Sequence, residues 1–194
     1  MRIFCTCYNF NMKHVSPLWS AFAIALIIAS LAAYYKFVLA VPLPPPRTIP
    51  VVGVPGSTHT HATMYVMIGD TVINFCSPKF MLKSPLTHFE DNNCIVVHKH
   101  ATGVTLQTFF KSIGVTLDPK CLMVPDRTPY CVDSEHKLSV VINKKEISVG
   151  ELNYYELRNN DHILINYGPE MGDDLLFKYN QVPDVPLDVN KSEK

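Results

Sequence analysis

Five of the eight histidines lie between positions 59 and 100, in a pattern that is typical of metal ligands. Four of them form two His-x-His pairs with the same Ala-Thr behind them, in the segments HTHAT at 59–63 and HKHAT at 98–102. Residues i and i+2 of a β-strand point to one face of a sheet, so each pair can present two imidazoles together. If the two strands are neighbours, about 4.8 Å apart, all four imidazoles converge. The predicted ligands are His59, His61, His98 and His100.

The fifth histidine, His88, lies between the two pairs and has Glu90 and Asp91 nearby. We expect His88 to be a further ligand. Alternatively, one of the nearby carboxylates orients the ring of a ligand through a hydrogen bond. Neutral imidazole suits Zn²⁺, Cu²⁺, Ni²⁺ or Fe²⁺, and a copper or zinc ion is the predicted cofactor. Two alternatives stay open, namely a polar, solvated strand face and a surface that responds to pH because clustered imidazoles titrate near neutrality.

Four cysteines follow position 60, and they are predicted to form two disulfides. Cys121 and Cys131 flank an irregular, proline-containing stretch, where a bridge would stabilise the loop by roughly 2–3 kcal/mol. Cys76 and Cys94 would close a second bridge around the loop that carries His88. The alternative for Cys94 is a thiolate ligand close to His98, as in His₂Cys copper sites.

The motifs of several common enzyme classes are absent from the sequence. There is no glycine-rich phosphate loop, no Gly-x-Ser-x-Gly elbow and no His-Glu-x-x-His, which argues against common hydrolases, kinases and dehydrogenases. Cys-x-x-Cys is also missing, so thiol-disulfide exchange lacks its usual motif. The 17 basic and 17 acidic residues balance, and nothing supplies the basic face that a nucleic-acid partner needs.

Residues 18–41 form an apolar run, interrupted by Lys36, that is long enough to span a bilayer. We predict a transmembrane helix that contacts membrane lipid, with residues 1–17 in the cytoplasm. A cleaved signal peptide is the alternative, because Val38-Leu39-Ala40 loosely fits a cleavage site. The four downstream cysteines suit an oxidising compartment, so the predicted location is the cell membrane with the C-terminal domain outside the cytoplasm.

The rest of the chain is predicted to be a stalk, one domain and a tail. The prolines of residues 42–57 favour an extended stalk, and the charged, proline-bearing residues 169–194 a flexible tail. Residues 58–168 form the α+β domain. Its expected elements are a hairpin at 62–75 around Gly69-Asp70, strands at 95–100, 138–142, 147–149 and 161–167, and a helix at 104–113 that Gly114 ends.

This order of elements, carried best by residues 140–168, resembles the β-grasp fold, a mixed sheet with one main helix. The words HTHA, HKHATGVTLQTFFKSIG and DHILINYG also resemble a family of single-span archaeal membrane proteins with an exported, His-rich domain. The resemblance covers residues 57–168 and implies the same layout and the same histidine positions. No activity is established for that family, so the resemblance implies no reaction.

Three functions remain open from the sequence. The first is a membrane-anchored, extracytoplasmic metal-binding protein that captures, delivers or senses copper or zinc. The second is a metalloenzyme at the same site, with an open coordination position for water and Glu90 as a base. The third is an accessory subunit of a membrane-protein complex, in which the histidines have no metal role. The metal-binding protein is the preferred interpretation.

Overall fold

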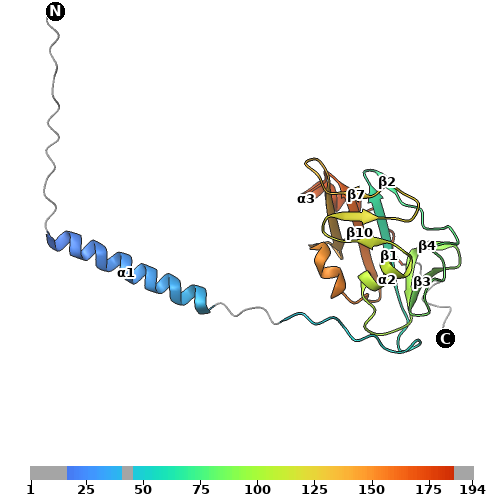
Figure 1. Ribbon diagram of the computed structural model, residues 1–194, viewed down its shortest axis with the longest axis horizontal. Coiled ribbons are helices and arrows are strands. Elements are labelled where there is room, and N and C mark those ends of the chain that lie inside the picture. The colour runs from blue at the N-terminus through green and yellow to red at the C-terminus, as the bar shows by residue number, and fades with distance from the viewer. Residues whose placement is uncertain (1–16, 41–45, 186–194) are drawn as a thin grey trace, which may run out of the picture. The chain divides into compact units, whose positions relative to one another are not determined.

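The computed structural model describes residues 17–40 and 46–185 (Figure 1). The chain divides into two compact units, Met1–Pro46 and Arg47–Lys194, and each is described by itself. The predicted cytoplasmic segment lies outside the described residues except for Pro17, and so do residues 41–45 of the predicted span and stalk and residues 186–194 of the predicted tail.

In the first unit, the described residues form the helix α1 (Pro17–Ala40). Its segment Leu18–Val38 is long and apolar enough to cross a membrane. At 1.5 Å per residue the helix is about 36 Å long, against about 30 Å for a hydrocarbon core. The Ser30 hydroxyl donates to the Leu26 carbonyl at 2.8 Å, so this polar group is satisfied within the helix. Length and composition fit a membrane span and a signal sequence equally.

The second unit is an α+β domain with a mixed sheet, as predicted. The strands of this sheet are β1 (Thr60–Ile68), β2 (Thr71–Val72), β3 (Thr87–Glu90), β4 (Asn93–Lys99), β8 (Lys137–Ile142), β9 (Lys145–Ile147) and β10 (Asp161–Gly168). Their order is β3-β4-β1-β10-β8-β9, and β2 pairs with the end of β1. The central strands β1 and β10 run parallel, and the other neighbours run antiparallel. In Figure 1, β4 and β3 lie beyond β1 at one side of the domain.

One face of the sheet is covered by α2 (Leu106–Ser112), the predicted helix. The Thr105 hydroxyl caps it by accepting from the Thr108 N–H at 3.1 Å, and Gly114 follows it with φ +75°. The short 3₁₀ helix η1 (Val149–Asn153) contributes Val149 and Leu152 to the same layer. The buried side chains between α2 and the sheet, which we call the α2 core, include Ala62, Met64, Val66, Phe89, Val97, Leu106, Phe109, Phe110, Ile163 and Ile165.

The opposite face carries a helix that was not predicted, α3 (Gly172–Tyr179). Leu175 and Tyr179 pack with Met67, Val141 and Leu164 in a second core. The buried Lys178 forms ion pairs with Glu170 and Asp70, and its ammonium also donates to the Gly69 carbonyl at 2.8 Å. The prediction of a flexible tail is therefore wrong up to residue 185, because apolar residues spaced along one helix face dock on the sheet.

The predicted stalk is also shorter than expected. The compact unit begins at Arg47, and two backbone bonds tie the segment to the end of β4: Gly53 N–H to the Thr102 carbonyl at 2.9 Å, and Gly56 N–H to the His100 carbonyl at 2.6 Å. Gly103 makes this contact possible, because a Cβ there would lie 2.1 Å from the Val51 carbonyl oxygen. Residues 47–57 therefore belong to the domain.

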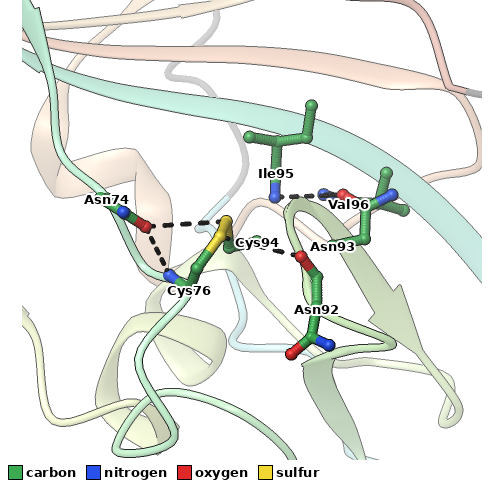
Figure 2. The surroundings of a disulfide bond; sticks show 7 residues. All are labelled: Asn74, Cys76, Asn92, Asn93, Cys94, Ile95 and Val96. Carbon is green, nitrogen blue, oxygen red and sulfur yellow. Dashed lines mark hydrogen bonds between the residues drawn. A yellow bond between two sulfur atoms is a disulfide. The ribbon is translucent and has the colours of Figure 1, made fainter.

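Both predicted cysteine pairs are bonded. Cys76 joins Cys94 of β4 with a Cα–Cα distance of 4.9 Å. Figure 2 shows the bridge and the Cys76 N–H, which donates to Asn74 Oδ1 at 2.7 Å. The bridge closes the segment between the two cysteines, which contains β3. A loop and no strand was predicted around His88. Cys121 joins Cys131 within a small second sheet of β5 (Thr116–Leu117), β6 (Cys121–Met123) and β7 (Tyr130–Cys131).

Candidate metal centre

Three of the predicted histidines form a row across three neighbouring strands. His61 of β1 lies opposite His98 of β4, and His98 lies opposite His88 of β3. Their chain neighbours Ala62, Val97 and Phe89 belong to the α2 core. Because side chains alternate along a strand, the three imidazoles lie on the face that α2 does not cover.

The other two histidines extend this row at the strand ends. His59 precedes β1 and His100 follows β4, each two residues from a histidine of the row. The ring centroids of His59 and His100 are 4.3 Å apart, those of His61 and His98 are 4.6 Å apart, and those of His88 and His100 are 4.8 Å apart. The two His-x-His pairs and His88 therefore form one continuous cluster, which we call the histidine cluster.

Within the histidine cluster, His59, His61 and His98 form a three-nitrogen group. One ring nitrogen from each lies within 4.8 Å of the others. The Nε2 atoms of His59 and His61 are 3.0 Å apart. Two nitrogens bound to one tetrahedral zinc at about 2.0–2.1 Å are about 3.3 Å apart, so this spacing is close to that of two ligands of one ion.

A second group consists of His88, Glu90 and His100, again with one ligand atom each within 4.8 Å. His88 Nδ1 is 2.6 Å from the Ser84 carbonyl oxygen, which can only accept a hydrogen bond. The proton of this hydrogen bond is therefore on Nδ1, and Nε2 faces the Glu90 carboxylate at 2.9 Å. A metal-binding histidine is commonly oriented in this way, by a carbonyl on the nitrogen that does not bind the ion.

The centre of the cluster is buried, and its charge state suits metal binding. His61, His88 and His98 are only 4%, 8% and 5% exposed. Burial, opposed by the Glu90 charge but aided by the neighbouring histidines, lowers the pKa of His98 to about 4, so its ring is neutral at physiological pH. For Glu90, burial raises the pKa, but the close contact with His88 and the nearby imidazoles outweigh it and lower the pKa. The neutral imidazole of His98 beside an ionised carboxylate is a combination that binds divalent metals.

One polar atom of His98 is unpaired among the described residues. Its Nδ1 is buried and has no hydrogen-bond partner among the described residues, although it lies 3.0 Å from a Glu90 oxygen. Leaving a buried polar atom unpaired costs about 1–3 kcal/mol. A cation between this nitrogen and its neighbours would remove that cost, so the residues present fit a metal ion.

The backbone of the cluster is held from several sides. His61 N–H donates to Asn159 Oδ1 at 3.0 Å, and the His61 carbonyl accepts from Asn160 N–H at 2.7 Å. The Thr87 hydroxyl donates to the His98 carbonyl at 2.8 Å. The disulfide to Cys94 restrains the start of β4, the strand that carries His98. The ligand positions are thus fixed by neighbouring elements and not by the histidines themselves.

All five histidines named from the sequence are brought together, and two of the alternatives are wrong. A solvated strand face does not describe three histidines that are at most 8% exposed. Cys94 is bonded to Cys76 and is not available as a thiolate ligand. The carboxylate that contacts the cluster is Glu90, whereas Asp91 lies in the turn after β3 with φ +53°.

The sequence predicted a carboxylate near His88 but not that Glu90 contacts a histidine of both groups. A signal for it was present, because His88 and Glu90 have the same i, i+2 spacing as the two histidine pairs. The Ser84 carbonyl and the Asn159 amide also support the cluster, and no local pattern in the sequence marks them.

The Cys76–Cys94 disulfide is expected to support both the fold and the metal centre. The double variant Cys76→Ser/Cys94→Ser should lower the free energy of unfolding by about 3 kcal/mol, since the bridge spans 18 residues. It should also weaken zinc binding, because the loop it closes carries His88 and Glu90. Denaturant unfolding and zinc titration of the metal-free protein measure the two effects.

The second disulfide provides the matched control for this prediction. Cys121→Ser/Cys131→Ser opens a bridge of 10 residues in the small sheet, away from the histidine cluster. It should lower stability by about 2.7 kcal/mol and leave the zinc dissociation constant unchanged. Equal effects of the two double variants on zinc binding would contradict a specific link between the first bridge and the cluster.

Comparison with known proteins found no match, whether among family models, curated proteins or solved structures.

Proposed function

We propose that this protein is a membrane-anchored, extracytoplasmic metal-binding protein that holds copper or zinc through its paired histidines. The observation that carries the proposal is the group of His59, His61 and His98, in which one ring nitrogen of each lies within 4.8 Å of the others. His98 is also buried, and its Nδ1 has no hydrogen-bond partner in the described part of the chain. Nitrogen and carboxylate donors without sulfur favour Zn²⁺ or Cu²⁺ over Cu⁺, which prefers thiolate and thioether ligands.

The proposed location is supported by two independent features. The apolar helix α1 provides a segment that can reach across a bilayer and contact its lipid. The two disulfides of the domain suit an oxidising compartment, which supports a domain outside the cytoplasm with the N-terminus inside. A β-grasp-like fold for the domain is supported by the strand order β4-β1-β10-β8-β9 with β1 parallel to β10.

Elemental analysis of the full-length chain tests the proposal. The protein is purified in detergent without a chelating column or a His tag, and copper and zinc are counted per chain before and after incubation with each metal. We expect at least one tightly held equivalent, and its loss in His98→Ala/His100→Ala, which removes one imidazole from each group. His136→Ala is the control, because His136 pairs with Asp133 and stacks on Tyr167, outside the cluster.

Two results would overturn the proposal. One is a wild-type protein that takes up neither metal while it is folded by circular dichroism. The other is an unchanged metal content in the double variant, which would place the bound metal elsewhere on the chain.

A further inference from the structure

The Glu90 carboxylate contacts one histidine of each group, each with a different oxygen. Its Oε2 lies 2.9 Å from Nε2 of His88, in the group with His100. Its Oε1 lies 3.0 Å from Nδ1 of His98, in the group with His59 and His61. No other described acidic side chain belongs to either of these groups.

The contact with His88 is not explained by a neutral imidazole and a carboxylate alone. Because Nδ1 of His88 donates to the Ser84 carbonyl, a neutral ring presents a lone pair from Nε2 to the carboxylate oxygen. Two acceptors 2.9 Å apart repel each other. A cation bound by both atoms turns this contact into two ligand bonds, and it does so without a charged ring among four other imidazoles.

The contact with His98 leads to the same conclusion from a different observation. Nδ1 of His98 lies within hydrogen-bond distance of Glu90 Oε1, yet it has no hydrogen-bond partner among the described residues. The side chain is more than nine-tenths buried. A buried nitrogen with a carboxylate oxygen at this distance and no bond between them fits two atoms that share an ion.

We propose that the histidine cluster binds two divalent cations, bridged by the carboxylate of Glu90, and that both are Zn²⁺ in the loaded protein. The first ion binds His59, His61 and His98, and the second binds His88 and His100. This inference rests on the proposed metal-binding function and deepens it. Five imidazoles and one carboxylate exceed the four ligands of a single tetrahedral zinc, whereas a shared carboxylate allots three or four protein ligands to each of two ions.

A bridged pair differs from a single ion in what it can do. Carboxylate-bridged metal pairs typically lie about 3.5–4 Å apart and can hold one anionic oxygen ligand between them. His59 and His100, which belong to different groups, are only partly buried and lie with their rings 4.3 Å apart. The space between the two ions would therefore lie at the side of the cluster that is nearest to solvent.

Stoichiometry and magnetic coupling of the full-length protein in detergent test the inference. Metal-free protein is titrated with Zn²⁺ by calorimetry, and bound zinc is counted after dialysis. We expect two equivalents in the wild type and one in His59→Ala and in His100→Ala, two variants at partly buried positions at the strand ends. With Cu²⁺ as the probe, the electron paramagnetic resonance signal of the wild type should show two coupled spins, and Glu90→Gln should lose the coupling and bind the second ion at least 10-fold more weakly.

Each alternative outcome separates this inference from the proposed function. One zinc equivalent in the wild type, lost in both single variants, overturns the second ion and leaves the metal-binding function standing. Two equivalents without spin coupling overturn the bridge by Glu90. No bound zinc or copper in folded wild-type protein overturns the inference together with the function on which it rests. Circular dichroism of each metal-free variant confirms that the fold is kept.

Discussion

Replacing His98 by leucine is expected to weaken zinc binding about 100-fold while the metal-free domain stays at least as stable as the wild type. The expected loss of zinc affinity follows from the number of ligands that share the binding free energy. The free energy of a structural zinc site, about 10–16 kcal/mol, is shared among four ligands, so each contributes about 3 kcal/mol. His98 is the central residue of the row, opposite both His61 and His88.

The stability half follows from the surroundings of the ring. Nδ1 of His98 is buried and makes no hydrogen bond to any residue that the structure describes, which costs the metal-free protein about 1–3 kcal/mol. Leucine fills a similar volume and removes this unpaired atom, and the substitution leaves the contact between Glu90 and His88 in place. We therefore expect an unfolding midpoint for the metal-free variant that equals or exceeds that of the wild type. A residue retained for function at the expense of stability behaves in this way.

Denaturant unfolding of metal-free protein and zinc titration measure the two halves separately. His136→Leu is the matched control, since His136 is exposed and lies outside the cluster, and it should change neither quantity. A variant that binds zinc as tightly as the wild type would contradict the role of His98 as a ligand. A variant that loses several kcal/mol without metal would show that His98 is needed for the fold instead.

Asp161→Ala is expected to lower the free energy of unfolding by about 4 kcal/mol, because three donors lose a buried charged acceptor. Asp161 is only 1% exposed and begins β10. Its carboxylate accepts from Asn143 Nδ2 at 2.8 Å, from the Tyr155 hydroxyl at 3.0 Å and from Arg158 N–H at 2.8 Å. Burial of the Tyr155 hydroxyl is the larger cause of its raised pKa, and the charge of Asp161 raises this pKa further. The hydroxyl therefore stays protonated and acts as a donor.

The same substitution should also weaken zinc binding. The turn before Asp161 holds the backbone of His61, through Asn159 Oδ1 and Asn160 N–H. Loss of the carboxylate that orders this turn loosens the clamp on His61. Asp126→Asn is the control, because Asp126 is exposed and pairs with Lys79 on the surface, and asparagine tolerates its φ of +63°. It should change neither stability nor zinc binding by a comparable amount. Thermal unfolding and zinc titration check both effects, and a loss of stability with unchanged zinc affinity would disprove the coupling.

The sequence by itself determined the elements whose signals are local. The alternation in MYVMI and TVINF around Gly69-Asp70 predicted the hairpin of β1 and β2, and the helical spacing of VTLQTFFKSI before Gly114 predicted α2. Spacing also singled out the four histidines of the two His-x-His pairs, because the i, i+2 rule depends only on strand geometry. His88 was added because it lies between the pairs and has acidic neighbours. The two disulfide pairs followed from an even number of cysteines and their positions.

Other elements could not be predicted from the sequence, because they form through contacts with distant parts of the chain. β3 has four residues and a register shift between His88 and Glu90, so it is too short and irregular for a periodic signal. α3 lies in a proline-bearing, charged stretch, and its helix is stabilised by packing of Leu175 and Tyr179 on the sheet. Residues 53–57 were predicted to be part of a stalk because the partners of their backbone hydrogen bonds, residues 100 and 102, are distant in the sequence.

The arrangement of the metal centre was likewise decided by tertiary contacts. His61, His98 and His88 meet because β4 pairs with both β1 and β3 in a register that places the three side by side. A shift of one residue in either pairing would send a histidine to the α2 core. Nothing local specifies that register, which depends on burial of Ala62, Val97 and Phe89 on the other face. The residue types and their spacing therefore predicted the candidate ligands. The contacts of Glu90 with both groups, on which the proposed two-ion arrangement rests, depend on strand pairing between distant segments of the chain.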